Sequence, residues 1–173
     1  MSARRAAPLA LALALLVACA GPGGAPAAFS CGVPHCALTA VPDVRAAETA
    51  DGRTLVHEPT GARVDVEVLA AGTRDDVDAF LAREGRALAL AVTWQQPPGE
   101  THGFEVRGLA GQTPPPPGTF FETDPEKRWL ATYRNPETGS VLVLRARAPA
   151  SVWDEAWTVL EPMLTRVVLT DRF

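Results

Sequence analysis

The sequence has 173 residues and a formal net charge of −4, because 20 acidic residues outnumber 16 basic ones. This length accommodates one ordinary domain with appendages. The acidic balance argues against a general phosphate-binding protein, and three cysteines are too few for a disulfide-dense scaffold.

The first 18 residues are expected to be a signal peptide. Arg4 and Arg5 form its basic start, and residues 6–17 form a short apolar segment. As a helix this segment would be about 18 Å long, whereas the hydrocarbon core of a bilayer is roughly 30 Å thick. A retained transmembrane helix is therefore not expected.

The segment Leu16-Val17-Ala18-Cys19 follows directly. It resembles the lipobox of bacterial lipoproteins, in which the cysteine is acylated and becomes the first mature residue. The resemblance implies a membrane anchor at Cys19, and the alternative is an ordinary signal peptide followed by a chance cysteine. Ala20 stands where the inner-membrane retention signal has aspartate, which favours the outer membrane, facing the periplasm, in a Gram-negative cell.

Residues 19–36 are expected to form a lipidated tether, because Gly, Pro and Ala dominate its first part. Export to an oxidising compartment favours a disulfide between Cys31 and Cys36. Unpaired or partner-linked thiols, a redox pair and a metal site with His35 remain alternatives. Redox pairs have two residues between the cysteines where this chain has four, and a fourth metal ligand is not apparent.

Residues 37–173 are expected to form a single α+β domain, with residues 37–52 irregular. Strands are predicted over 54–57 and 63–69, joined by a turn at Pro59-Thr60-Gly61. The second strand alternates valines with acidic residues, so one of its faces should be buried. A helix over residues 74–88 should follow, with acidic residues in its first turn.

The next part of the chain predicts an antiparallel meander. Pro97-Pro98-Gly99 should close the first hairpin, residues 114–117 form a stiff proline break, and residues 135–139 form a turn. The five strand candidates are 91–96, 103–109, 119–123, 128–134 and 141–148.

A C-terminal helix is predicted from apolar residues at helical spacing. Ser151 is expected to cap its N-terminus, and Pro162 should kink or end it near Glu161. The apolar face would hold Trp153, Trp157, Leu160 and Leu164, and its two tryptophans are interpreted as core residues.

The order of elements and three local patterns are similar to the PsbP-like fold. This fold is shared by an extrinsic photosystem subunit, a nuclear-transport regulator and several bacterial lipoproteins. The resemblance implies an antiparallel sheet of about six strands flanked by helices (an α/β/α sandwich), and a non-catalytic accessory or partner-binding domain. The patterns are His57-Glu58-Pro59-Thr60-Gly61, the hairpin Tyr133…Gly139…Val141-Leu142-Val143-Leu144, and Trp153-Asp154-Glu155 followed by the helix Val159-Leu160-Glu161-Pro162-Met163-Leu164.

No catalytic motif is apparent in the sequence. It has no G-x-S-x-G elbow, P-loop, H-E-x-x-H or G-x-G-x-x-G pattern. His35, His57 and His102 are interpreted as solvated loop histidines, and Asp75, Asp76 and Asp78 as first-turn helix residues rather than metal ligands. We therefore expect neither enzymatic activity nor a cofactor or metal.

The sequence favours an envelope lipoprotein that binds a protein partner and no nucleic acid. The alternative is a periplasmic module for a small or apolar ligand, in which aromatic residues on several predicted elements would line one cavity. Those residues are Trp94, Trp129, Tyr133 and Trp157. A thiol-redox role for Cys31 and Cys36 ranks third.

Overall fold

A computed structural model describes residues 28–30, 36–49, 52–69, 74–88, 91–101, 103–114 and 124–169. The signal peptide, Cys19, most of the tether, Cys31 and the strand candidate at 119–123 lie outside these residues. The described elements are β1 (Ala28–Ser30), β2 (Cys36–Thr39), β3 (Val44–Thr49), β4 (Gly52–His57), β5 (Arg63–Leu69), α1 (Arg74–Ala87), β6 (Ala91–Thr101), β7 (Phe104–Gln112), β8 (Glu126–Arg134), β9 (Val141–Pro149), the 3-10 turn η1 (Ala150–Val152), α2 (Trp153–Thr165) and β10 (Val168–Leu169).

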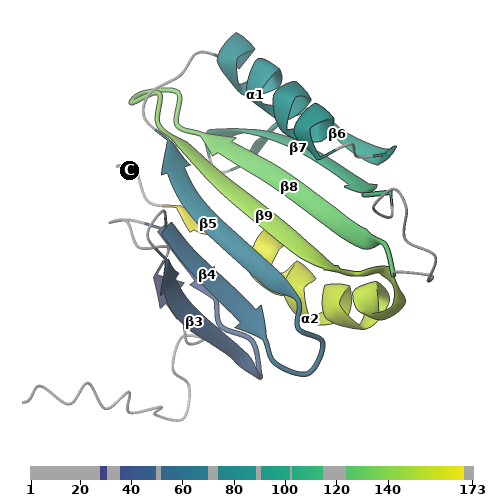
Figure 1. Cartoon of the computed structure of the whole chain (residues 1–173). Helices are drawn as coiled ribbons and strands as arrows, with labels where there is room; N and C mark the ends of the chain where they lie inside the picture. Colours follow the sequence, from purple (N-terminus) through teal and green to yellow (C-terminus); the bar gives the residue numbers. More distant parts are fainter. Residues whose placement is uncertain are drawn as a thin grey trace, which may run out of the picture.

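The centre of the fold is a seven-stranded antiparallel sheet in the order β3-β4-β5-β9-β8-β7-β6, formed by the described residues. A small sheet, β1-β2-β10, joins the two ends of the described chain. Figure 1 shows α1 on one face of the main sheet and α2 on the other. The predicted α+β sandwich is therefore confirmed.

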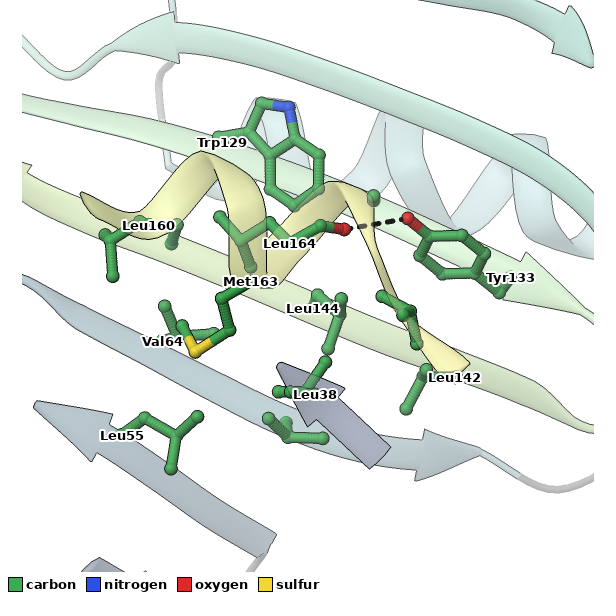
Figure 2. Packing of buried hydrophobic residues seen from close by; sticks show 14 of the residues in the cluster. Leu38, Leu55, Val64, Trp129, Tyr133, Leu142, Leu144, Leu160, Met163 and Leu164 are labelled. Carbon is green, nitrogen blue, oxygen red and sulfur yellow. Dashed lines mark hydrogen bonds between the residues drawn. The ribbon is translucent and has the colours of Figure 1, made fainter. Parts of the chain in front are cut away.

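Strand β9 shows why both faces of the sheet need a cover. Successive side chains point to opposite faces, and residues 141–144 are all buried. Leu142 and Leu144 pack in the large core with α2, whereas Val141 and Val143 pack in a smaller core with Val77 of α1. Figure 2 shows the large core, in which Leu38 of β2 lies near these leucines.

Several predicted elements are confirmed at close to their expected bounds. Strand β5 begins and ends at the predicted residues, and α1 ends one residue before the predicted end. The turn before β5 has Gly61 at φ +68°, a conformation that glycine adopts without a steric penalty. The hairpins β6–β7 and β8–β9 are also present.

The prediction that residues 37–52 are irregular is wrong. They contain β3, most of β2 and the first residue of β4. Strand β3 lies at an edge of the sheet, where only one side makes ladder hydrogen bonds and alternation of apolar residues is not required. Its sequence, VRAAET, consequently gives no period-two signal.

Strand β6 extends through Pro97 and Pro98 rather than ending before them. It is the other edge strand, and its register is irregular between Gln96 and Gly99. Proline is tolerated there because the missing N–H group can face away from the ladder.

The C-terminal helix departs from expectation at both ends. Its N-cap residue is Val152, which makes no side-chain cap, and Ser151 lies in η1, where its N–H and hydroxyl both bond to Asp124. The helix does not end near Glu161 but continues to Thr165. The two residues after Pro162, Met163 and Leu164, are both 0% exposed, and burying two such side chains offsets a proline cost of about 3 kcal/mol.

Candidate functional site

Three of the aromatic residues proposed as ligand contacts lie in the large core beside α2. Trp129 of β8 is 8% exposed, and its ring centroid lies 5.7 Å from that of Trp157. Trp157 in turn stacks on Trp153 at 5.6 Å. Such pairs contribute about 0.5–1.5 kcal/mol beyond the area they bury, so packing accounts for these side chains.

Tyr133 lies on the same face of β8 as Trp129. Its hydroxyl donates a hydrogen bond to the carbonyl oxygen of Leu164 at 3.0 Å, which satisfies a backbone acceptor in the last turn of α2 (Figure 2). Burial raises the pKa of Tyr133 to about 12. The hydroxyl of Tyr133 thus links β8 to α2 through a buried hydrogen bond.

The fourth aromatic residue, Trp94, is placed only by its backbone, which pairs with Ala110 between edge strand β6 and β7. Its side chain lies outside the described part of the structure. The ligand-binding role of the four aromatic residues stays a prediction. Trp129 and Tyr133 belong to the buried core, and Trp157 is partly buried against it.

Cys36 is disulfide-bonded and 5% exposed in the large core. The other two cysteines lie outside the described residues, so the pairing with Cys31 stays a prediction. A redox cysteine must be accessible to attack, and the burial of Cys36 instead fits a structural role.

His57 is not the solvated loop residue that the sequence suggested. It is 4% exposed on β4, and its Nδ1 atom lies 2.7 Å from the hydroxyl of Thr60. His35 and His102 lie outside the described residues. Within the described ranges, no three His, Cys, Asp or Glu side chains are grouped as a metal site.

The face of the main sheet that carries α1 is the polar one. Arg145 of β9 points to this face, where it pairs with Glu67 of β5 at 2.7 Å and Glu84 of α1 at 3.4 Å. Arg107 of β7 is 6% exposed beneath the same helix and pairs with Asp78 at 3.2 Å. Each of these arginines ties α1 to the sheet.

Beyond α1, the sheet register aligns three arginines on this face. Arg147 of β9 is directly opposite Arg63 of β5 on one side and Arg128 of β8 on the other. Residues opposite one another in an antiparallel pair point to the same face. We call Arg63, Arg147 and Arg128 the arginine row; Figure 1 shows β5, β9 and β8 uncovered by a helix on this face over much of their length.

A hollow of about 50 Å³ lies beside the arginine row. Its charged lining consists of Arg128, Arg147, Arg145, Asp65 and Glu84, and Leu88 and Leu130 contribute apolar surface. A space of this size holds a few waters or one small anionic group rather than a ring system.

The arginine row was absent from the sequence-based expectations. The period-two pattern of each strand places Arg63, Arg128 and Arg147 away from the large core, which is the one local signal available. The β8–β9 hairpin places Arg128 opposite Arg147, but Arg63 joins them only through the pairing of β5 with β9, which lie far apart in sequence. No local pattern reports that register.

Comparison of the sequence with protein-family models and with curated proteins gives no match. Solved structures do match. The solution structure of PsbP (CyanoP) from the cyanobacterium Synechocystis sp. PCC 6803 aligns with a TM-score of 0.62 at 11% identity, covering 90% of this chain and 99% of that one.

Two other solved structures share the architecture. LpqN of Mycobacterium tuberculosis, described as involved in cell envelope biogenesis, aligns with a TM-score of 0.53 at 17% identity and covers 83% of this chain and 90% of its own. The Ran-binding protein Mog1p of Saccharomyces cerevisiae gives 0.55 at 10% identity, over 79% of this chain and 91% of its own.

At these identities the likeness establishes the fold alone. The protein is an α+β sandwich built on a main antiparallel sheet with one helix on each face. More particularly, it has the PsbP/Mog1-like fold, as the resemblance in the sequence implied.

Proposed function

We propose that this protein is an exported lipoprotein, anchored through acylated Cys19, whose folded domain binds a protein partner without catalysing a reaction. The proposed place is the bacterial cell envelope, at the outer membrane facing the periplasm in a Gram-negative cell. The observation that supports this proposal most is the difference between the two faces of the main sheet. One face packs against α2, and the other leaves a charged surface uncovered beyond α1.

The packed core supports binding at a surface rather than inside the domain. Trp129, Tyr133 and Trp157, the aromatic residues that could have lined an internal ligand cavity, are packed against one another or against α2. The names of two structural neighbours describe envelope biogenesis and Ran binding. These descriptions of the two neighbours support the proposal that a domain of this fold serves an accessory or binding function.

No helix among the described residues is both long enough and apolar enough to span a membrane. In our proposal the attachment depends on Cys19. Two or three acyl chains would hold the protein firmly, at about 0.8 kcal/mol per buried CH₂ group.

The test has two arms, both in native membranes of cells that produce the full chain. In the first, labelled palmitate should be incorporated into the wild type and lost in Cys19→Ala. In the second, a photo-crosslinking amino acid replaces Val56, which lies opposite Arg63 on the open face, and Thr158 on the α2 side as control. A single recurring protein adduct from the Val56 position alone is expected.

Each arm contradicts a different part of the proposal. Retention of label in Cys19→Ala would refute the anchor. Turnover of an envelope substrate by the purified chain, or a small-molecule adduct in place of a protein at the Val56 position, would refute the partner-binding function.

A further inference from the structure

We propose that the arginine row and its adjoining hollow form a binding site for carboxylate side chains in an acidic segment of the protein partner. This inference rests on the proposed function and specifies the chemistry of the partner. The row is Arg63, Arg147 and Arg128, on three adjacent strands.

The alignment of the arginines is unfavourable in the free protein. Like charges directly opposite one another in a sheet destabilise the strand pair, and here both neighbours of Arg147 carry its own sign. A bound carboxylate would remove this repulsion. Anion binding therefore explains an arrangement that stability alone does not favour.

The local acids compensate the row only in part. Arg128 forms a short ion pair with Glu126, and Arg147 is 3.7 Å from Asp65. That distance is too long for a direct hydrogen bond, and the other oxygen of Asp65 already accepts the Thr54 hydroxyl at 2.7 Å. Within the described part of the chain, no ion pair engages Arg63.

Arg147 also has an unused donor. Its Nε atom is buried and has no hydrogen-bond partner in the structure, although its side chain as a whole is 37% exposed. A buried donor without a partner is costly. Arg147 lines the hollow of about 50 Å³, which has room for a carboxylate to approach this guanidinium.

Charge and size favour a discrete acidic segment over an extended polyanionic surface. The whole chain carries a net charge of −4, so a nucleic acid or an anionic membrane surface, which would also face the acidic remainder of the chain, would meet more repulsion than a short acidic segment confined to the row. Neighbouring strands are about 4.8 Å apart, so the row extends over roughly 10 Å. In an extended peptide, alternate residues on one face are about 7 Å apart, which allows two carboxylates to engage the row at once.

Arg145, the other arginine beside the hollow, differs from the arginine row because two carboxylates already pair with it. It is bonded to both Glu67 and Glu84 and supports a ring of α1 by lying 5.6 Å from the centroid of Phe80. Its charge is already compensated. The proposed binding energy therefore comes from Arg147 and Arg63, with Arg128 held in place by Glu126.

The test measures binding of a fluorescent hexaglutamate peptide to the full chain in detergent, by anisotropy, at an ionic strength of about 0.01 M, where electrostatic screening is weak. A hexaglutamine peptide is the uncharged control. Arg147→Gln should weaken binding about tenfold, and Arg63→Gln, at an exposed position, about threefold. Arg166→Gln removes the same charge from an exposed position after α2 and should leave binding unchanged.

A second measurement distinguishes a carboxylate of a protein from the phosphate of a lipid headgroup. Glycerol phosphate should displace hexaglutamate only at concentrations far above those of unlabelled hexaglutamate. Displacement at equal charge concentration would overturn the protein-segment assignment in favour of a headgroup site. Equal binding by the wild type, Arg147→Gln and Arg166→Gln would overturn the site itself.

Failure of this inference and failure of the proposed function give different results. In the crosslinking experiment, the double variant Arg63→Gln/Arg147→Gln should lose the adduct that the wild type forms. If that variant keeps the adduct, the protein binds a partner elsewhere and only the arginine-row inference fails. If the wild type forms none, the function itself fails, whatever the peptide does.

Discussion

Tyr133 is the only tyrosine in the chain, and its ionisation can be followed without interference from another phenol. Burial raises its pKa to about 12 in the folded protein, against about 10 in an unfolded chain. The fold therefore favours the protonated hydroxyl. Its contribution to stability is fully present below about pH 10 and is lost as the pH rises towards 12.

The expected size of the effect follows from the two pKa values. At about pH 11 the unfolded phenol is mostly ionised and the folded one mostly protonated, which costs the folded state about 1.4 kcal/mol. Tyr133→Phe removes both the titration and the bond to the Leu164 carbonyl. At about pH 8 it should lower the free energy of unfolding by about 1–2 kcal/mol, and this deficit should nearly vanish at about pH 11.

The assay is urea unfolding of the wild type and Tyr133→Phe at both pH values, with tyrosinate absorbance of the folded wild type recorded in parallel. Taking the difference between the two proteins cancels the titration of cysteines and of the single lysine, Lys127. A deficit that is independent of pH would refute the reasoning. Tyrosinate absorbance that rises near pH 10 in the folded protein would refute it as well.

The remaining predictions concern the close approach of Gly111 to the backbone of Ala91 and the ion pairs of Arg145. For each variant, urea unfolding measures the change in the free energy of unfolding. Gly111→Ala should cost about 1–3 kcal/mol, because its Cβ would lie 2.4 Å from the Ala91 carbonyl oxygen. The control is Gly85→Ala inside α1, where the added Cβ would have only a 3.9 Å contact with Leu109 Cδ2 of β7. It should stabilise by about 0.5–1 kcal/mol, and equal effects would contradict the geometry. Arg145→Gln should cost about 1 kcal/mol, because Arg145 is only partly exposed between two carboxylates. This cost should shrink in about 1 M salt, and a salt-independent cost would argue against the ion pairs.

Elements with a complete local pattern were predicted from the sequence at close to their true bounds. The valines of β5 alternate with polar residues, and the buried face of α1 repeats at helical spacing. The β8–β9 hairpin has a turn in which the Asn135 side chain accepts bonds from the N–H groups of Glu137 and Thr138. In each case the residues that specify the element lie within the element.

Elements whose stability comes from elsewhere were missed or misplaced. Strand β2 is short, and its Leu38 is fully buried because α2 and the main sheet surround it. The start of α2 is held by Asp124, 27 residues before Ser151 along the chain. The continuation past Pro162 depends on burial of Met163 and Leu164. None of these partners lies in a local sequence window.

The candidate site divides in the same way. The sequence directed attention to tryptophans and a tyrosine, and tertiary packing uses three of them to join β8 to α2. The sequence did not predict a site at Arg63, Arg128 and Arg147, because each is an ordinary polar residue in its own strand. Only the registers β5–β9 and β8–β9 align them.

By itself, the sequence determined the α+β class, the central hairpins and the amphipathic helices, because periodicity is a property of neighbouring residues along the chain. Tertiary structure decided that His57 is buried, that Pro162 remains within a helix and that three arginines share one row. These outcomes depend on strand order and register, which are set by burial summed over the whole core. A single segment cannot specify that sum, since its partners lie far along the chain, 27 residues away for Asp124 and Ser151 and 78 residues away for Glu67 and Arg145.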